Sequence, residues 1–299
     1  MPLPVVAFLG IGLMGRPMAL RLAGAGYALR AWNRSAAKAQ AIEGAGIVAG
    51  ASVLDAVAGA AIVVSMLADG AAVEAAIEAA LPAMAPGTLW IDMSSTRHDE
   101  ALRMHARLAG EGMRCLDAPV SGGVLGAEAG TLAIMAGGSL PDFNAAAPLF
   151  AVLGNAQLVG PGGSGQVAKL CNQLIVGATI SVVAEALLLA QAAGADPGAV
   201  RDAIRGGFAG SRILELHGER MLARNFVPGG QVKSQLKDMH NVLAAAGAAG
   251  LVLPMTAAAT RSYASIAADL GGADHAAALL ALERINPGQR VGEGPDVLP

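Results

Sequence analysis

The chain has 299 residues, of which 54% are hydrophobic, 14% are charged and 3% are aromatic, and its formal net charge is -3. This composition excludes a disordered or collagen-like chain, and the length suits one large or two ordinary domains. Positive and negative residues nearly balance without runs of like charge, so we expect neither nucleic acid nor a membrane surface as a partner.

The first half of the chain alternates short apolar runs with helix-like segments. Residues 4–10 form an apolar run that ends in glycine, and residues 16–26 repeat apolar side chains at helical spacing. A second apolar run covers residues 27–32, and Ser35 is placed to cap the helix that follows it. This order of strand, turn, helix and strand predicts a βαβ unit.

Further apolar runs alternate with helix-like segments as far as residue 160. They cover residues 61–67, 88–93, 113–120, 131–138 and 156–160. Such alternation predicts a mostly parallel, doubly wound sheet of the Rossmann type.

After residue 165 the sequence contains only helix-like segments between Gly and Pro breaks. We therefore predict a Rossmann-type α/β domain over residues 1–163 and an all-α domain over residues 164–299, joined by a long helix at 168–194. The other helices are expected at 197–205, 211–224, 231–247, 254–269 and 274–285. The segment after them, 286–299, is rich in Pro and Gly, and we predict it to be loosely ordered.

The long helix raises the question of a membrane span, because residues 170–184 are uncharged. Polar residues interrupt this run, among them Asn172 and Gln173, and about 20 predominantly apolar residues are needed to cross a bilayer. We therefore expect neighbouring helices or a second subunit, in a homodimer or homotetramer, to bury the helix on all sides.

Cysteine and histidine residues show no metal-binding pattern. The two Cys and five His lack spacings such as C-x-x-C or H-E-x-x-H, so we expect no metal site. Only Cys115 and Cys171 could form a disulfide, and the first residues lack the basic region and cleavage site of a signal peptide. These features predict a reduced, cytoplasmic protein.

Three glycines between the first strand and the first helix fit the pattern G-x-G-x-x-G. They would permit a tight turn and let helix N–H groups approach a pyrophosphate closely. A second match at residues 160–165 has no strand after its helix, and we interpret it as a hinge. The first match is therefore predicted to bind a dinucleotide. Its cofactor-binding residues are Gly10, Gly12, Leu13, Met14 and Gly15.

Three polar residues follow the second predicted strand, where enzymes that use NAD place an acidic residue on the adenosine ribose. This chain has Asn33, Arg34 and Ser35 there, with no carboxylate to repel a 2′-phosphate. Arg34 can stack on adenine and pair with that phosphate, and its two neighbours can donate hydrogen bonds to it. We therefore predict NADP as the preferred cofactor, with NAD as the alternative.

Three segments, in this order, carry a family resemblance: FLGIGLMGRPMALRLAGAG, DAPVSGGVLGAEAGTLAIMAGG and GGSGQVAKLCNQ. Over residues 4–285 the chain resembles the β-hydroxyacid dehydrogenases, which are relatives of 6-phosphogluconate dehydrogenase. Four C-terminal segments, IRGGFAGSRIL, RNFVPGG, QLKDM and GGADHAAL, most resemble the tartronate semialdehyde reductase branch of that family. The resemblance implies an NADP(H)-dependent oxidoreductase that reduces a small semialdehyde acid to a hydroxy acid.

The resemblance also implies roles for particular residues. Lys169 would be the catalytic residue, and either Asn172 or Gln173 would supply an amide that assists it. The substrate carboxylate would be held by Ser121, Gly122 and Gly123. Further cofactor contacts would come from Met66, Leu67, Thr96 and Lys237.

The chemistry of these residue types agrees with the implied roles. Lys169, Asn172 and Gln173 are spaced i,i+3 and i,i+4, so they share a helix face that could turn toward a cleft between the domains. Reduction by hydride leaves an alkoxide that needs a proton, and a lysine, with a usual pKa of about 10.4, is protonated at neutral pH. Small residues at 121–123 can expose successive N–H groups to a carboxylate.

Two alternatives to tartronate semialdehyde reduction remain open at this point. A 3-hydroxyisobutyrate dehydrogenase or a succinic semialdehyde reductase would keep the same catalytic lysine with a larger pocket. A noncatalytic NADP(H)-binding sensor would keep the glycine motif, since that motif alone ensures binding and not turnover.

Overall fold

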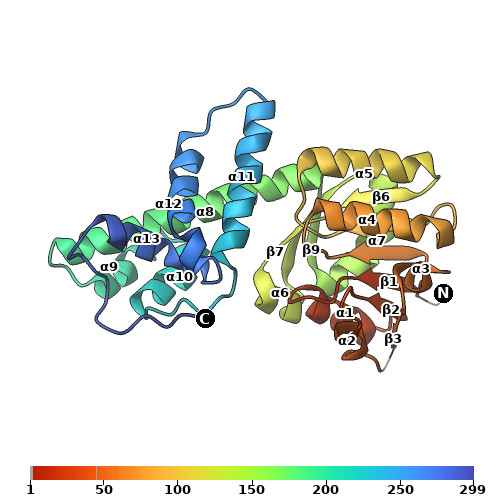
Figure 1. Cartoon of the computed structure of the whole chain (residues 1–299), viewed down its shortest axis with the longest axis horizontal. Coiled ribbons are helices and arrows are strands. Elements are labelled where there is room, and N and C mark those ends of the chain that lie inside the picture. Colours follow the sequence, from red (N-terminus) through yellow and green to blue (C-terminus); the bar gives the residue numbers. More distant parts are fainter. Residues whose placement is uncertain (1–2, 45) are drawn as a thin grey trace. The chain divides into compact units, whose positions relative to one another are not determined.

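The computed structural model describes residues 3–44 and 46–299, so the first two residues of the predicted first domain and Ala45 lie outside the description. The chain divides into two compact units, Met1–Lys169 and Leu170–Pro299. The first unit is a Rossmann-type α/β domain and the second is all-α, which confirms the predicted fold class (Figure 1).

The first unit is built on a single twisted sheet. Its strands are β1 (Val6–Leu9), β2 (Leu29–Trp32), β3 (Ile47–Ala49), β4 (Ile62–Ser65), β5 (Leu89–Asp92), β6 (Arg114–Asp117), β7 (Val120–Ser121), β8 (Leu132–Gly137) and β9 (Gly154–Gly160). The order is β3-β2-β1-β4-β5-β6-β8-β7, with β9 beside β8. The pairs from β3 to β6 are parallel, and β8 runs antiparallel to β6 and β7. The chain reverses its direction of winding between β1 and β4, where such sheets bind their ligands.

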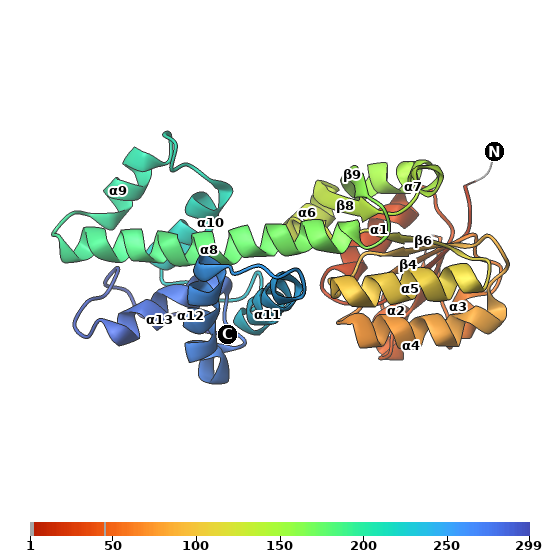
Figure 2. The same ribbon diagram turned by 90° about the horizontal axis from the view of Figure 1, so that it is seen from above.

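Helices cover both faces of this sheet, because successive side chains of a strand point to opposite faces. Phe8 of β1 packs into one hydrophobic core and Ala7 into the other. The first core is covered by α1 (Gly15–Gly24), α2 (Ala36–Gln40), α6 (Gly123–Ala129) and α7 (Leu140–Leu153). The second is covered by α3 (Val53–Val57), α4 (Gly70–Ala80) and α5 (His98–Gly110). Figure 2 shows α4 and α5 side by side on this second face.

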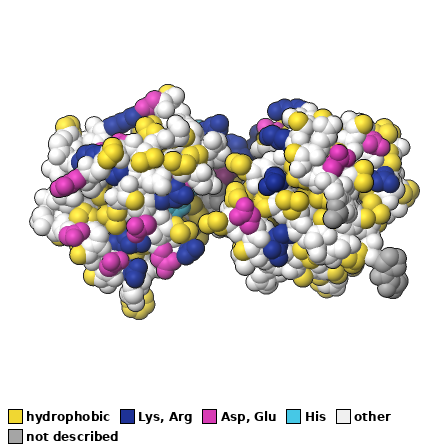
Figure 3. Space-filling view, turned by 90° about the horizontal axis from the view of Figure 1, so that it is seen from below, with side chains coloured by type: hydrophobic (Ala, Val, Ile, Leu, Met, Phe, Trp, Pro, Cys, Tyr) yellow, Lys and Arg dark blue, Asp and Glu magenta, His cyan; other side chains and the backbone are white. Residues whose placement is uncertain are grey.

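Charged side chains are mixed on the surface rather than separated by sign. Between α4 and α5, Arg103 pairs with Glu74 at 2.9 Å and Arg107 pairs with Glu78 at 2.7 Å. Exposed pairs of this kind each contribute at most about 1 kcal/mol to stability. On the face drawn in Figure 3, basic and acidic side chains are interspersed, so that face has no large patch of one sign to attract a polyanion.

One long helix, α8 (Ser164–Ala192), begins in the first unit and continues into the second. It is long and apolar enough to cross a membrane by length and composition, and 44% of its most apolar window is buried. In the described part of the single chain one face of this helix is not covered by neighbouring helices, so the expected burial on all sides would need a second subunit. Ile175, Val182 and Leu189 are 58%, 49% and 70% exposed. Their spacing of seven residues places them on one face of the helix.

The second unit packs further helices around the rest of α8. They are α9 (Pro197–Ile204), α10 (Arg212–Leu222), α11 (Val232–Ala248), α12 (Pro254–Leu270) and α13 (Ala278–Ile285), all close to the predicted segments. In Figure 1, α11 and α12 lie side by side. Side chains such as Tyr263 and Phe226, both fully buried, form one hydrophobic core.

The C-terminal segment differs from its predicted loose order. Val291 is fully buried, and Phe226 N donates to Val297 O at 2.9 Å. Arg224, which is 1% exposed, donates to Val291 O at 2.6 Å and also pairs with Asp296. Long-range bonds therefore hold a segment whose composition alone suggested disorder.

Candidate active site

The predicted glycine motif forms a tight turn between β1 and α1. Gly10 has φ of +107°, and a Cβ there would collide with the carbonyl oxygen of Met66. A Cβ on Gly15 would collide with the carbonyl oxygen of Gly10, so the start of α1 packs directly on the turn. A Cβ on Gly12 would meet nothing within 4 Å. The turn is thus packed against protein backbone at Gly10 and Gly15 and has open space at Gly12, as a pyrophosphate-binding turn requires.

No side chain caps α1, and within its first turn Arg16 N already donates to Gly12 O at 3.0 Å while Pro17 has no N–H. Asn33, after β2, accepts a hydrogen bond from Ile11 N at 3.0 Å and donates to Ser35 O at 3.1 Å. The Asn33 amide therefore holds the glycine turn against the end of β2. Arg34 and Ser35 are exposed beside it, and Ser35 stands at the start of α2 without a side-chain cap bond.

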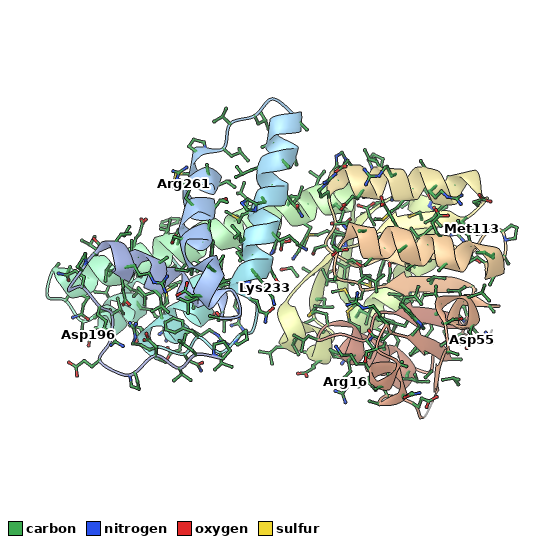
Figure 4. The ribbon with its side chains drawn as sticks, in the orientation of Figure 1. Arg16, Asp55, Met113, Asp196, Lys233 and Arg261 are labelled. Atoms are coloured by element: carbon green, nitrogen blue, oxygen red, sulfur yellow. The ribbon has the colours of Figure 1, made fainter. Side chains whose placement is uncertain are left out.

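Arg16 was not among the predicted cofactor residues, although it directly follows the glycine turn. It lies in the first turn of α1 and is exposed (Figure 4). Arg16 directly follows Gly15 in the sequence, but an arginine at the start of a helix is usually a solvent-exposed charge, so its position alone does not indicate cofactor binding.

Met66 and Leu67 follow β4 and form the neighbouring wall of this turn. Met66 N donates to Leu9 O at 2.8 Å, which continues the pairing of β4 with β1. Leu67 N donates to Ser94 Oγ at 2.8 Å, which ties this loop to the loop after β5. The structure therefore brings Met66 and Leu67 next to Gly10, where the resemblance places cofactor contacts.

Thr96 lies in the loop after β5, and this loop is bound to α8. Thr96 N donates to Gln166 Oε1 at 3.1 Å, and Gln166 Nε2 donates to Ser94 O at 2.8 Å. Gln166 is fully buried, and Thr96 is 3% exposed. Within the described part of the chain the Thr96 Oγ1 hydroxyl is buried and has no hydrogen-bond partner. A buried hydroxyl in this state suits a ligand group at the same edge of the sheet.

Asp92 ends β5 in a buried polar network under these loops. Its Oδ1 accepts hydrogen bonds from Ser65 Oγ at 2.7 Å and Ser94 N at 3.2 Å. Trp90 Nε1 donates to the Ser65 hydroxyl at 3.0 Å. Burial raises the pKa of Asp92 to about 6, although its hydrogen bonds with Ser94 and Ser65 oppose the rise.

The predicted carboxylate-binding residues form a turn between β7 and α6. Gly122 and Gly123 have φ of +137° and +62°, which favours glycine at both positions. Ser121 is half-buried and the two glycines are exposed. Successive backbone groups of this kind can form an anion-binding concavity.

Lys169 lies beside this turn. It is 8% exposed, and its Nζ donates to Val120 O at 2.9 Å, one residue before Ser121. Its helix is held by Asp117, whose Oδ1 accepts from Gly163 N at 2.7 Å and whose Oδ2 accepts from Gln166 N at 2.9 Å. The structure therefore brings together the lysine and the turn that the resemblance assigned to one site.

Asn172 and Gln173 follow on α8 within the second unit. Asn172 Nδ2 donates to Gln173 Oε1 at 2.8 Å, and Gln173 Nε2 donates to Asp238 Oδ2 at 2.7 Å. Lys237 Nζ lies 3.4 Å from Asp238 Oδ1 on α11. Both ends of the Gln173 amide are thus engaged by protein groups, its oxygen by Asn172 and its nitrogen by Asp238.

Comparison with known proteins assigns the family. Residues 5–171 match the family model described as the NAD binding domain of 6-phosphogluconate dehydrogenase. Residues 163–282 match the model described as the NAD-binding region of NADP-dependent 3-hydroxyisobutyrate dehydrogenase. The chain belongs to the β-hydroxyacid dehydrogenase family. It is an NAD(P)-dependent oxidoreductase, as the sequence predicted.

Several relatives of this family cover nearly the whole chain. The chain is 41% identical to 2-hydroxy-3-oxopropionate reductase of Escherichia coli over 283 residues, 93% of this chain and 97% of that one. It is 35% identical to NAD-dependent L-serine dehydrogenase of Pseudomonas aeruginosa over 269 residues, 86% and 90% of the two chains. The solved structure of Mycobacterium tuberculosis 3-hydroxyisobutyrate dehydrogenase with L-serine superposes with a TM-score of 0.87 at 32% identity, covering 94% and 99%.

Sequence reasoning missed the polar residues that position the site. Gln166, Asp117 and Asp238 each bond to groups far away in the chain, with separations of 46 to 72 residues. The position of Asp117 at a strand end was the one available indication, because polar residues at the carboxyl ends of parallel strands line binding sites.

Proposed function

We propose that the chain reduces tartronate semialdehyde to glycerate with NADPH. The observation that carries this proposal is the buried amine of Lys169, 2.9 Å from Val120 O and next to the turn at 121–123. The relative named 2-hydroxy-3-oxopropionate reductase, after a synonym of tartronate semialdehyde, supports the choice of substrate.

In the proposed reaction, bound NADPH supplies the hydride that adds to the carbonyl carbon. The Ser121 hydroxyl and the N–H groups of Gly122 and Gly123 hold the substrate carboxylate. The Lys169 ammonium then donates its proton to the carbonyl oxygen as negative charge develops, and becomes a neutral amine. Asn172 orients the substrate through its amide, since that of Gln173 is engaged with Asp238.

The cofactor preference for NADPH rests on Arg34. This side chain is exposed beside the glycine turn, with the Ser35 hydroxyl next to it. A guanidinium can stack on the adenine and pair with the 2′-phosphate. Met66, Leu67 and Thr96 would hold the cofactor along the neighbouring strand ends, and Lys237 would be a further cofactor contact. The name of the Pseudomonas aeruginosa relative makes NAD the alternative.

A lysine substitution tests the catalytic role. Lys169→Ala should lower kcat about 100-fold or more, because a positioned general acid contributes about 10² to 10⁴. The affinity for NADPH should stay unchanged. Lys233→Ala removes an exposed lysine on α11 (Figure 4) and should keep full activity. Unchanged turnover of Lys169→Ala in steady-state assays would remove Lys169 from the mechanism.

A substrate panel separates the remaining candidates. With NADPH and NADH, we expect the highest kcat/KM for tartronate semialdehyde, ahead of succinic semialdehyde and methylmalonate semialdehyde. In the oxidative direction, glycerate should exceed 3-hydroxyisobutyrate and L-serine. A higher kcat/KM for any competitor would replace the proposed substrate. Tight NADPH binding without turnover of any of them would favour the noncatalytic sensor.

We also propose a cytoplasmic homodimer or homotetramer. Ile175, Val182 and Leu189 form an apolar stripe on α8 that a second copy would cover, with contacts of the coiled-coil type. Cys115 and Cys171 are both free thiols, which supports a reducing compartment. Light scattering that shows only monomer at micromolar concentration would contradict the assembly.

A further inference from the structure

One fully buried glutamine joins the loop after β5 to the helix that carries Lys169. Both ends of the Gln166 amide are used: Oε1 accepts from Thr96 N at 3.1 Å, and Nε2 donates to Ser94 O at 2.8 Å. The backbone N–H of Gln166 donates to Asp117 Oδ2 at 2.9 Å. Gln166 therefore connects the loop at 94–96, its own helix and the end of β6.

This junction lies next to Lys169 and to the loop that the proposed function places at the cofactor. Lys169 follows Gln166 by three residues, so the two side chains leave α8 on the same face. The loop that Gln166 holds contains Thr96 and continues through Ser94 Oγ to Leu67 N at 2.8 Å. Movement of α8 relative to this loop would therefore change the distance between the lysine and the groups that face the cofactor.

We propose that Gln166 is a positioning residue that fixes the cofactor-facing loop at 94–96 to the lysine-bearing turn of α8. The loop's contact with the cofactor rests on the proposed function. The attachment itself rests on the two amide hydrogen bonds and on complete burial. The amide carries no net charge and both its ends are bonded to the loop, so its effect on the reaction passes through Thr96 and Lys169.

A side chain of similar size that lacks donor and acceptor atoms cannot form these two hydrogen bonds. In Gln166→Leu, Thr96 N and Ser94 O would both lose their buried partner, which disfavours the present position of the loop. In Gln166→Glu, the protonated carboxyl keeps one acceptor and one donor, whereas the ionised carboxylate has no donor for Ser94 O. Burial raises the pKa of such a carboxyl, so the protonated form is accessible in mildly acidic buffer.

Hydrogen exchange of the Thr96 amide tests the attachment without requiring activity. By NMR or peptide mass spectrometry, exchange in Gln166→Leu should be at least about tenfold faster than in the unaltered chain. Gln191→Leu is the matched control, because Gln191 is exposed near the end of the same helix. Circular dichroism establishes that each variant is folded. Equal Thr96 exchange in a folded Gln166→Leu variant would overturn the proposal.

Kinetics test the consequence for the reaction. Gln166→Leu should lower kcat about 10- to 100-fold, since a misplacement of about 1 Å can have this effect. The KM for NADPH should change less than threefold. The kcat of Gln166→Glu, expressed as a fraction of the kcat of the unaltered chain at the same pH, should rise as the pH falls from about 8 to about 5.5. A raised KM with unchanged kcat would assign Gln166 to cofactor binding alone and contradict the positioning role.

The two proposals fail in different ways. Absence of semialdehyde turnover by the unaltered chain would reject the proposed function. The exchange measurement would still support or overturn the attachment of the loop to α8. Normal turnover in folded Gln166→Leu would reject the positioning role and leave the proposed function standing.

Discussion

Asp92 shows how a single buried carboxyl makes stability depend on pH. It is 2% exposed, and burial raises its pKa to about 6 from the usual value of 3.8, against the effect of its hydrogen bonds with Ser94 and Ser65. The folded chain therefore holds a proton between about pH 4 and about pH 6 that the unfolded chain has released. Stability from this group is present at the acidic end of that window and is lost as the pH rises through it.

Asp92→Asn should remove this dependence, because the asparagine keeps an acceptor oxygen for Ser65 and Ser94. The free energy of unfolding of the unaltered chain, measured relative to the variant, should fall by up to about 3 kcal/mol between about pH 4 and about pH 7. Urea denaturation at a series of pH values gives this difference, in which titrations common to both proteins cancel. A difference that stays constant with pH would show that Asp92 has no raised pKa.

Residue identity was predictable where local spacing determines the role, and not where a distant partner does. Gly10, Gly12 and Gly15 could be recognised from their spacing between a strand and a helix, and the structure places them in a tight turn. Gln166 gave no such indication, since its partners are 70 and 72 residues away. The role of Asn33 also depends on a distant partner, because its side-chain oxygen accepts a hydrogen bond from Ile11 N.

At the scale of elements, regular periodicity was sufficient for most helices and for the long strands. The short β3 (Ile47–Ala49) was missed, because three residues show no period. The turn at 160–165, which the sequence predicts to be a hinge, also packs closely, because a Cβ on Gly165 would collide with the Asp117 carbonyl oxygen. Glycine there permits close packing of α8 on the end of β6, and Asp117 ties down the first helical turn.

One buried arginine makes several contacts that hold the C-terminal segment. Arg224 pairs with Glu283 through two bonds of 2.8 and 2.9 Å, donates to Val291 O at 2.6 Å and contacts Asp296. The arginine side chain is 1% exposed and that of Glu283 is 12% exposed. Removing one partner of a buried pair leaves an uncompensated charge, which is more costly than losing an exposed pair.

Arg224→Ala should therefore lower the free energy of unfolding of the second unit by about 3 to 5 kcal/mol. Arg224→Lys keeps the charge without the forked geometry and should have a smaller effect. Arg205→Ala removes an exposed arginine paired with Asp202 and should change stability by less than about 1 kcal/mol. Far-UV circular dichroism in urea measures all three variants, and tryptophan fluorescence, which reports only the first unit, identifies the part of the transition that belongs to the second. Equal stability of Arg224→Ala and Arg205→Ala would show that the segment does not depend on this arginine.

At the scale of the whole molecule, the fold and the family determine the cofactor class more firmly than the substrate. Relatives that cover most of the chain are named for 2-hydroxy-3-oxopropionate, L-serine and 3-hydroxyisobutyrate. Relatives named for different small acids therefore share one family, and the fold alone does not specify which acid a member uses. Alternation of strands and helices predicted the fold class, but no periodic pattern encodes the shape of a substrate pocket.

The two units also differ in a way that allows them to be followed separately. Both tryptophans of the chain, Trp32 and Trp90, lie in the first unit, which also contains the glycine turn. Tryptophan fluorescence therefore reports unfolding of the first unit, whereas far-UV circular dichroism reports helices of both. A ligand that binds only the folded first unit stabilises it in proportion to the logarithm of its concentration over Kd.

NADPH at about 100 times its Kd should stabilise the first unit by about 2.7 kcal/mol and move the fluorescence transition to higher urea. NADH at the same concentration should move it less, because it lacks the phosphate that Arg34 is proposed to bind. In Arg34→Asp, the two cofactors should produce shifts of similar size, whereas Arg261→Asp makes the same charge change on α12 and should keep the difference. Equal shifts by NADPH and NADH in the unaltered chain would contradict the NADP preference, and no shift with either would contradict dinucleotide binding at the turn.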